Sequence, residues 1–161
     1  MSERITQEQI DLLISKHPKL LIIRDSDDFQ YTRKIATFMC GGGWFDIIDA
    51  TLTSVQKYID YSRKYSETPV EQYKITAILE KCGNLMFYYT GKNPIIDHIL
   101  DVAMEMSKRI CEISGQPGKL YAMDGWYKTL SKDLAEMLGY EEDTYLIGDS
   151  SGAEPTTVTG A

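Results

Sequence analysis

The chain has 161 residues, of which 43% are hydrophobic and 25% are charged, so it can bury the core of one domain and is not of the disordered class. Its formal net charge of −7 argues against direct nucleic-acid binding, because phosphates are repelled by an acidic surface. Three cysteines are too few for a disulfide framework, and the sequence has neither a leader nor an apolar run of about 18 residues. We therefore expect a cytoplasmic protein that makes no contact with membranes.

The N-terminal region predicts one short helix followed by an extended segment. Residues 6–16 have apolar side chains at helical spacing, and Thr6 and Gln9 have the spacing of a capping box. Pro18 lies just beyond the end of this helix, where proline is common. Residues 35–40 are expected to be extended and to lead into a run of glycines.

Three glycines, Gly41, Gly42 and Gly43, precede a helix that we expect from Trp44 to about Tyr65. They favour a sharp structural turn that lets Trp44 become buried. The alternative is a phosphate-binding loop, which usually carries Lys or Arg in the next helical turn. Asp46 stands there instead and would repel an anion.

The middle of the chain predicts a hairpin and a long helix. Residues 72–90 alternate and are rich in aromatic side chains, with a turn at 82–84. Residues 94–113 predict a helix that Gly115, Pro117 and Gly118 end in a structural turn. Its main apolar stripe consists of Ile95, Ile99, Val102, Met106 and Ile110, and is widened by Ile96, Leu100 and Ala103. This width predicts burial of the whole set against the hairpin.

The last third predicts a short strand at 119–123, a turn at Asp124–Gly125 and a helix at 127–138 closed by Gly139. Residues 149–161 are small and polar, and we expect a flexible tail there. Residues 1–148 are expected to form a single α+β domain. In it a β-hairpin or small antiparallel sheet packs against three or four helices.

The sequence contains no recognisable catalytic or metal-binding motif. It has no G-x-S-x-G, and its three cysteines and two histidines are scattered without metal-ligand spacing. Asp97 and Asp101 share a helix face, which suits either a cation and acid–base work or an ordinary solvated surface. We therefore predict that the protein is not an enzyme and has no cofactor or bound metal.

Aromatic residues are the more suggestive feature, because tyrosine and tryptophan anchor many protein interfaces. The candidates for partner binding are Tyr88, Tyr89, Tyr121, Trp126 and Tyr127. The same residues could instead cover a small sheet as core. Both interpretations stay open for Tyr88 and Trp126, whereas Phe87 and Trp44 are expected in the core.

Four blocks occur in order along the chain: CGGGWFDIID (40–49), EKCGNLMFYYTG (80–91), AMEMSKRICEISGQPGKL (103–120) and GWYKTLS (125–131). Together they resemble a family of small, uncharacterised accessory proteins of tailed phages and prophages. The family pattern implies a zinc knuckle with a C-x2-C pair and a later cysteine. Here Cys111 is kept, but Ser114 and Ser131 stand at the other cysteine positions, and Met86 replaces the usual arginine. Serine is a poor zinc ligand, so we expect no zinc in this protein.

The resemblance implies a phage accessory protein that acts in the cytoplasm of the bacterial host. Our leading hypothesis is that it binds a host protein and modulates or inhibits it, in host takeover or anti-defence. One alternative is an anti-defence protein that binds or cleaves a nucleotide signal, using Gly41–Gly43. The other is an acidic mimic of nucleic acid.

Overall fold

A computed structural model describes residues 3–23 and 34–142 of the chain and has an α+β fold. The helices are α1 (Gln7–Lys16), α2 (Pro18–Leu21), α3 (Phe45–Tyr65), α4 (Pro94–Ser107) and α5 (Lys132–Leu138), with a 3-10 turn at Gly42–Trp44. The strands are β1 (Ile22–Ile23), β2 (Lys34–Ile35), β3 (Thr37–Met39), β4 (Lys74–Lys81), β5 (Asn84–Thr90), β6 (Lys119–Met123), β7 (Trp126–Leu130) and β8 (Glu141–Glu142).

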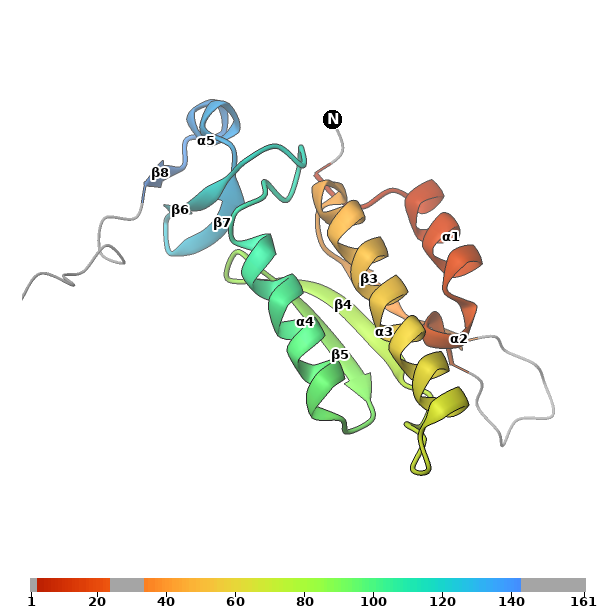
Figure 1. Cartoon of the computed structure of the whole chain (residues 1–161). Coiled ribbons are helices and arrows are strands. Elements are labelled where there is room, and N and C mark those ends of the chain that lie inside the picture. The colour runs from red at the N-terminus through yellow and green to blue at the C-terminus, as the bar shows by residue number, and fades with distance from the viewer. Residues whose placement is uncertain (1–2, 24–33, 143–161) are drawn as a thin grey trace, which may run out of the picture.

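The larger part of the fold is a helical layer on a three-stranded sheet of order β3-β4-β5 (Figure 1). The predicted hairpin is β4 and β5, which turn at Cys82–Gly83. Strand β3 was expected only as an extended segment, and it pairs with β4 in the parallel direction. Helices α3 and α4 run antiparallel to each other in front of the sheet in Figure 1, and α1 lies on the other side of α3.

The core of this part lies between the helices and the sheet. Its fully buried aliphatic residues include Ile48, Leu52, Val55 and Ile59 of α3, Ile96 of α4, Ile75, Ile78 and Leu85 of the hairpin, and Leu13, Leu20 and Leu21 of α1 and α2. Each contributes about 1.5–3 kcal/mol of burial free energy. The opposite face of the sheet carries a cross-strand row of Met39, Leu79 and Met86, with Tyr88 in the next row. Met39 and Tyr88 are exposed there.

Helix α1 forms as its capping box predicts. The Thr6 hydroxyl accepts a hydrogen bond from the Gln9 amide, and the Gln9 side chain accepts one from the Thr6 amide. The helix ends at Lys16, and Pro18 then begins the short helix α2. His17 lies at the junction with its Nε2 atom 2.7 Å from a carboxylate oxygen of Asp49, which attaches this junction to α3.

The C-terminal part is a small sheet of order β7-β6-β8 with α5, and it has its own apolar cluster. The helix predicted at 127–138 is wrong in its first half, because Trp126–Leu130 is strand β7. This segment pairs with β6 around Asp124 and Gly125, both of which have positive φ. The pairing of β7 with β6 in this hairpin overrides the helical spacing of Leu130, Leu134 and Leu138. Gly139 ends α5 in the left-handed conformation, as expected.

Helix α4 is shorter than the predicted helix at 94–113, since it ends at Ser107. In the loop that follows, two backbone amides donate to carbonyls of the loop itself and not to the carbonyls four residues earlier, as they would in a continued helix. The Cys111 amide donates to the Gln116 carbonyl and the Gly118 amide donates to the Arg109 carbonyl. The predicted tail at 149–161 lies outside the described residues. Within residues 3–23 and 34–142, no helix combines the length and the apolar character needed to cross a bilayer.

Candidate functional site

The glycine loop is packed against the loop that follows α4. A Cβ atom on Gly41 would stand 2.0 Å from the Glu112 carbonyl oxygen, and one on Gly43 would stand 2.4 Å from that of Cys111. The Gly43 amide donates a 2.7 Å hydrogen bond to the Glu112 carbonyl. Protein backbone therefore occupies the space on the Glu112 side of this loop, where a phosphate cradle would need an open approach and free amides.

Trp44 is fully buried, as expected, and its indole nitrogen donates to the Ile110 carbonyl at 2.8 Å. Beside this junction Glu112 is buried, with one carboxylate oxygen bonded to the Lys128 ammonium and the other without a partner among the described residues. Burial raises the pKa of Glu112, and the bond from Lys128 opposes that rise. Burial, with Glu112 nearby, raises the pKa of the Cys40 thiol to about 12, so this thiol is a poor nucleophile.

Cys111 and Ser114 lie together in the same loop, with the Ser114 amide donating to the Cys111 sulfur at 3.4 Å. Burial pushes the pKa of the Cys111 thiol upward, but hydrogen bonds from Ser114 and from the Ser131 backbone outweigh it and lower the pKa. Cys111, Ser114 and Ser131, which stand at the cysteine positions of the zinc knuckle implied by the resemblance, are therefore close in space, and hydrogen bonds hold the Cys111 thiol. In the described part of the chain, no three His, Cys, Asp or Glu side chains are grouped to hold a metal ion.

The five aromatic candidates do not form one exposed surface. Tyr121 is only 5% exposed and belongs to the C-terminal apolar cluster, so it is not available to a partner. Tyr89 is half-buried, stacks on Tyr73 and donates its hydroxyl to Asp97 at 2.9 Å. Tyr127 is half-buried in β7. Trp126, at 74% exposure on the β6–β7 hairpin, and Tyr88 on the open sheet face remain accessible.

The predicted burial of the main apolar stripe at 95–110 is wrong for three of its five residues, since only Ile99 and Ile110 pack partly buried against the core. Ile96, Leu100 and Ala103 are buried, whereas Ile95, Val102 and Met106 are exposed, with Val102 at 61%. The two sets lie one residue apart on the helix, about 100° around its axis. The hairpin covers only the first set because a helix packed on a sheet buries one face.

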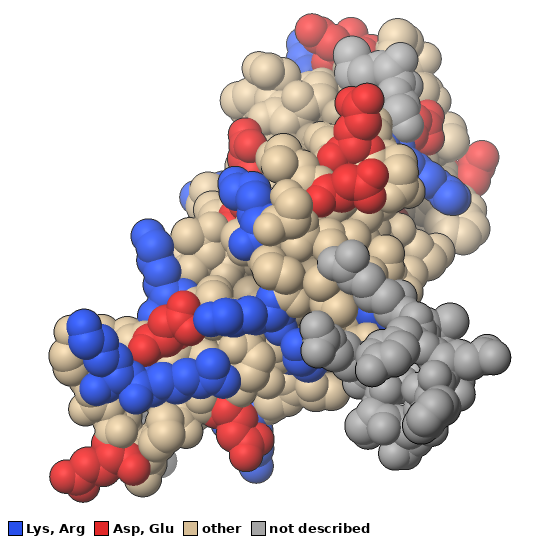
Figure 2. Space-filling view, turned by 90° about the vertical axis from the view of Figure 1, so that its right-hand side faces the viewer, with Lys and Arg blue, Asp and Glu red and all other residues tan. Residues whose placement is uncertain are grey.

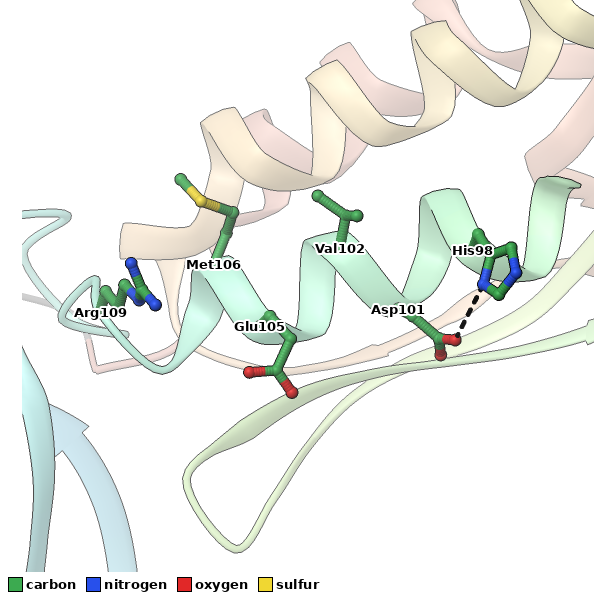
Figure 3. A pocket seen from close by; sticks show the side chains of 6 residues that line it. All are labelled: His98, Asp101, Val102, Glu105, Met106 and Arg109. Carbon is green, nitrogen blue, oxygen red and sulfur yellow. Dashed lines mark ion pairs between the residues drawn. The ribbon is translucent and has the colours of Figure 1, made fainter.

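A shallow depression of about 410 Å³ lies on this exposed side of α4. Its lining residues are His98, Asp101, Val102, Glu105, Met106 and Arg109. Figure 3 shows Val102 and Met106 pointing to the side on which α3 runs, while Asp101 and Glu105 point away from it. Asp101 faces His98 at 3.8 Å, whereas Asp97 accepts from Tyr89. These two aspartates are therefore engaged separately and do not form the paired carboxylate site considered from sequence.

Helix α3 extends the apolar surface toward its C-terminal end. Tyr61 is 62% exposed, Tyr65 is exposed as well, and their rings are 4.8 Å apart. Tyr58 lies on the same helical face and is half-buried. We define the α3–α4 surface as the exposed side of the two helices formed by Ile95, Val102 and Met106 of α4 with Tyr58, Tyr61 and Tyr65 of α3.

This surface is not among the predictions from the sequence, although one signal was present there. The apolar positions of α4 cover a wider arc than one helix face can bury, which is a reason to expect some of them outside the core. The tyrosines of α3 gave no comparable signal, because exposure depends on where neighbouring elements pack. Comparisons of this chain with protein-family models, with curated proteins and with solved structures find no match.

Proposed function

We propose that this protein is a non-catalytic accessory protein of a tailed phage or prophage, which binds a host protein in the bacterial cytoplasm and modulates or inhibits it. The α3–α4 surface is the contact surface in this proposal. The observation that carries it is the exposure of Ile95, Val102 and Met106 on a helix whose adjacent stripe is fully used by the core. Contiguous exposed apolar side chains mark interaction sites on monomeric proteins.

The composition of this surface suits a protein partner. It contains three tyrosines and a methionine, and both residue types are enriched in protein interfaces. Carboxylates and an arginine, Asp101, Glu105 and Arg109, border it and would form a polar rim. The alternative of a nucleotide-binding glycine loop receives no support, because the Gly43 amide already donates to Glu112.

The test is capture of host protein by immobilised wild-type and variant chains. Val102→Asp places a charge at the centre of the proposed contact, and we expect it to reduce the captured partner about tenfold or more. Leu12→Asp is the matched control, because Leu12 is an exposed aliphatic residue on α1. Both variants should unfold at the wild-type temperature. Equal capture by wild type and Val102→Asp would contradict the proposed surface.

A further inference from the structure

Helix α3 is divided by charge along its length. Its acidic residues Asp46 and Asp49 lie in the first two turns, and the third, Asp60, faces α2 and the Gln56 side chain. The C-terminal half presents two adjacent rows at steps of three and four residues, Lys57–Tyr61–Lys64 and Tyr58–Tyr61–Tyr65, which share Tyr61. We call this set the cationic–aromatic end of the α3–α4 surface.

Neither lysine of this end forms an ion pair with a carboxylate of the described residues, whereas six other lysines do: Lys16, Lys19, Lys108, Lys119, Lys128 and Lys132. The Lys64 ammonium lies 5.1 Å from the centre of the Tyr65 ring. Figure 2, which faces the side of α1 and α2, shows Lys and Arg side chains toward the lower left of the molecule, with fewer Asp and Glu side chains among them. Lys57 and Lys64 thus place two positive charges beside exposed tyrosines, on a chain whose net charge is −7.

We infer that the cationic–aromatic end of the α3–α4 surface docks an acidic segment of the partner protein, through Lys57 and Lys64 with Tyr61 and Tyr65. This inference rests on the proposed function and adds the chemistry of the partner. Unpaired lysines beside exposed tyrosine rings complement carboxylates that sit next to apolar side chains. The continuing stripe of Val102 and Met106 complements apolar residues of the same segment.

A single strand of nucleic acid also stacks on tyrosines and pairs with lysines. Two observations favour protein. The net charge of −7 repels a polyanion that extends beyond the small cationic end. The surface also continues into exposed aliphatic side chains of α4, Ile95 and Val102, which have no role in contacts to phosphate or to stacked bases.

The experiment places a photo-crosslinking amino acid, p-benzoylphenylalanine, at Tyr61, at Val102 or at Trp126, in cells of the bacterium that carries the gene. After irradiation, the crosslinked peptides are identified by mass spectrometry. From position 61 we expect a crosslink to a protein segment with an excess of Asp and Glu. Crosslinks to nucleic acid or to a basic segment would overturn the inference.

Charge-reversal variants test the role of the two lysines. Lys57→Glu with Lys64→Glu should lower the crosslink yield from position 61 about tenfold, because like charges across an interface repel. Lys81→Glu with Lys132→Glu changes the net charge equally at exposed sites outside α3 and α4, and should leave the yield within about twofold. An unchanged yield in the first pair overturns the inference.

Failure of this inference can be separated from failure of the proposed function. Crosslinks to a protein from position 102 but not from position 61 would keep the α3–α4 surface and reject the cationic–aromatic end. Crosslinks from position 126 alone would reject the surface and this inference together. Thermal unfolding of each variant checks that the fold is kept, which we expect because the substituted side chains are exposed.

Discussion

The Gly43 amide donates a 2.7 Å hydrogen bond to the carbonyl of Glu112, although the two residues are 69 positions apart in the chain. The sequence blocks 40–49 and 103–120 therefore meet in space, and this contact accounts for the glycines of the first block. Glycine is needed at 41 and 43 because backbone, rather than a ligand, occupies the place of a side chain.

Gly41→Ala should strongly destabilise the protein. The added methyl group would stand 2.0 Å from the Glu112 carbonyl oxygen, so the two loops must separate. We expect a loss of about 3 kcal/mol or more in the free energy of unfolding, measured in urea.

Gly125→Ala is the matched control for that substitution. Gly125 has a φ of +83° and no atom within 4 Å of an added Cβ, so the variant carries only the left-handed strain of about 1–2 kcal/mol. If the two variants unfold at the same urea concentration, the close approach of the loops is not what requires glycine at position 41.

Lys128→Met should destabilise the protein in a pH-dependent manner. Burial holds the pKa of Glu112 above its ordinary value of 4.5, and Lys128 is the cation bonded to it. At pH 8 the variant leaves a buried carboxylate without a counterion, which costs about 3–5 kcal/mol. Glu112 takes up a proton as the pH falls through its folded-state pKa toward 4.5, so the loss should shrink by pH 5.

The double variant Glu112→Gln with Lys128→Met tests the origin of this pH dependence. It removes both charges, and the difference from Lys128→Met should grow as the pH rises. Urea unfolding at pH 5 and pH 8 measures it. A loss in Lys128→Met that is equal at the two pH values would show that the carboxyl group of Glu112 is not responsible.

Local patterns predicted the parts of the fold that depend on neighbouring residues in the chain. The capping box of Thr6 and Gln9, the periodicity of α3 and the hairpin turn at Cys82–Gly83 are all short-range features, and the structure agrees with them. The parallel pairing of β3 with β4 joins distant segments, and sequence spacing does not contain that information. The strand at Trp126–Leu130 pairs with its neighbour β6 across the predicted Asp124–Gly125 turn, but the helical spacing of Leu130, Leu134 and Leu138 favoured a helix there.

The candidate site was harder to predict for the same reason. Val102 and Ile96 look equivalent in the sequence, since each belongs to an apolar stripe at helical spacing. Only the position of the hairpin and of α3 decides that Ile96 is buried and Val102 is exposed. Which apolar residues of such a helix stay exposed therefore depends on how the helices and the hairpin pack together.

The three cysteines should react very differently with Ellman's reagent at pH 8. Cys82 is exposed at the hairpin turn, whereas Cys40 and Cys111 are buried. One thiol should react rapidly, and the other two should react only as fast as the chain unfolds, because the reagent needs access to a thiolate. Cys82→Ser should abolish the rapid phase. A second rapid thiol in the native protein would contradict the buried packing of the loop at Cys111.

Two adjacent tyrosines offer the last test, because β5 places them on opposite faces of the sheet. Tyr89 donates to the carboxylate of Asp97 at 2.9 Å, whereas Tyr88 is exposed. Tyr89→Phe should lower the free energy of unfolding by about 1.5–3 kcal/mol, the usual contribution of a hydrogen bond to a charged group. Tyr88→Phe should change it by less than about 0.5 kcal/mol.

This difference should also depend on pH. Burial and the bond to Asp97 raise the pKa of Tyr89 from 10.0 to about 12 in the folded protein. The stability that wild type gains over Tyr89→Phe is therefore complete below pH 10 and is lost as the pH rises toward 12, where the folded state must give up the hydroxyl proton. Urea unfolding at pH 8 and pH 11 measures the change. A constant difference, or an equal loss in Tyr88→Phe, would mean that the Tyr89 hydroxyl does not hold α4 on the sheet through Asp97.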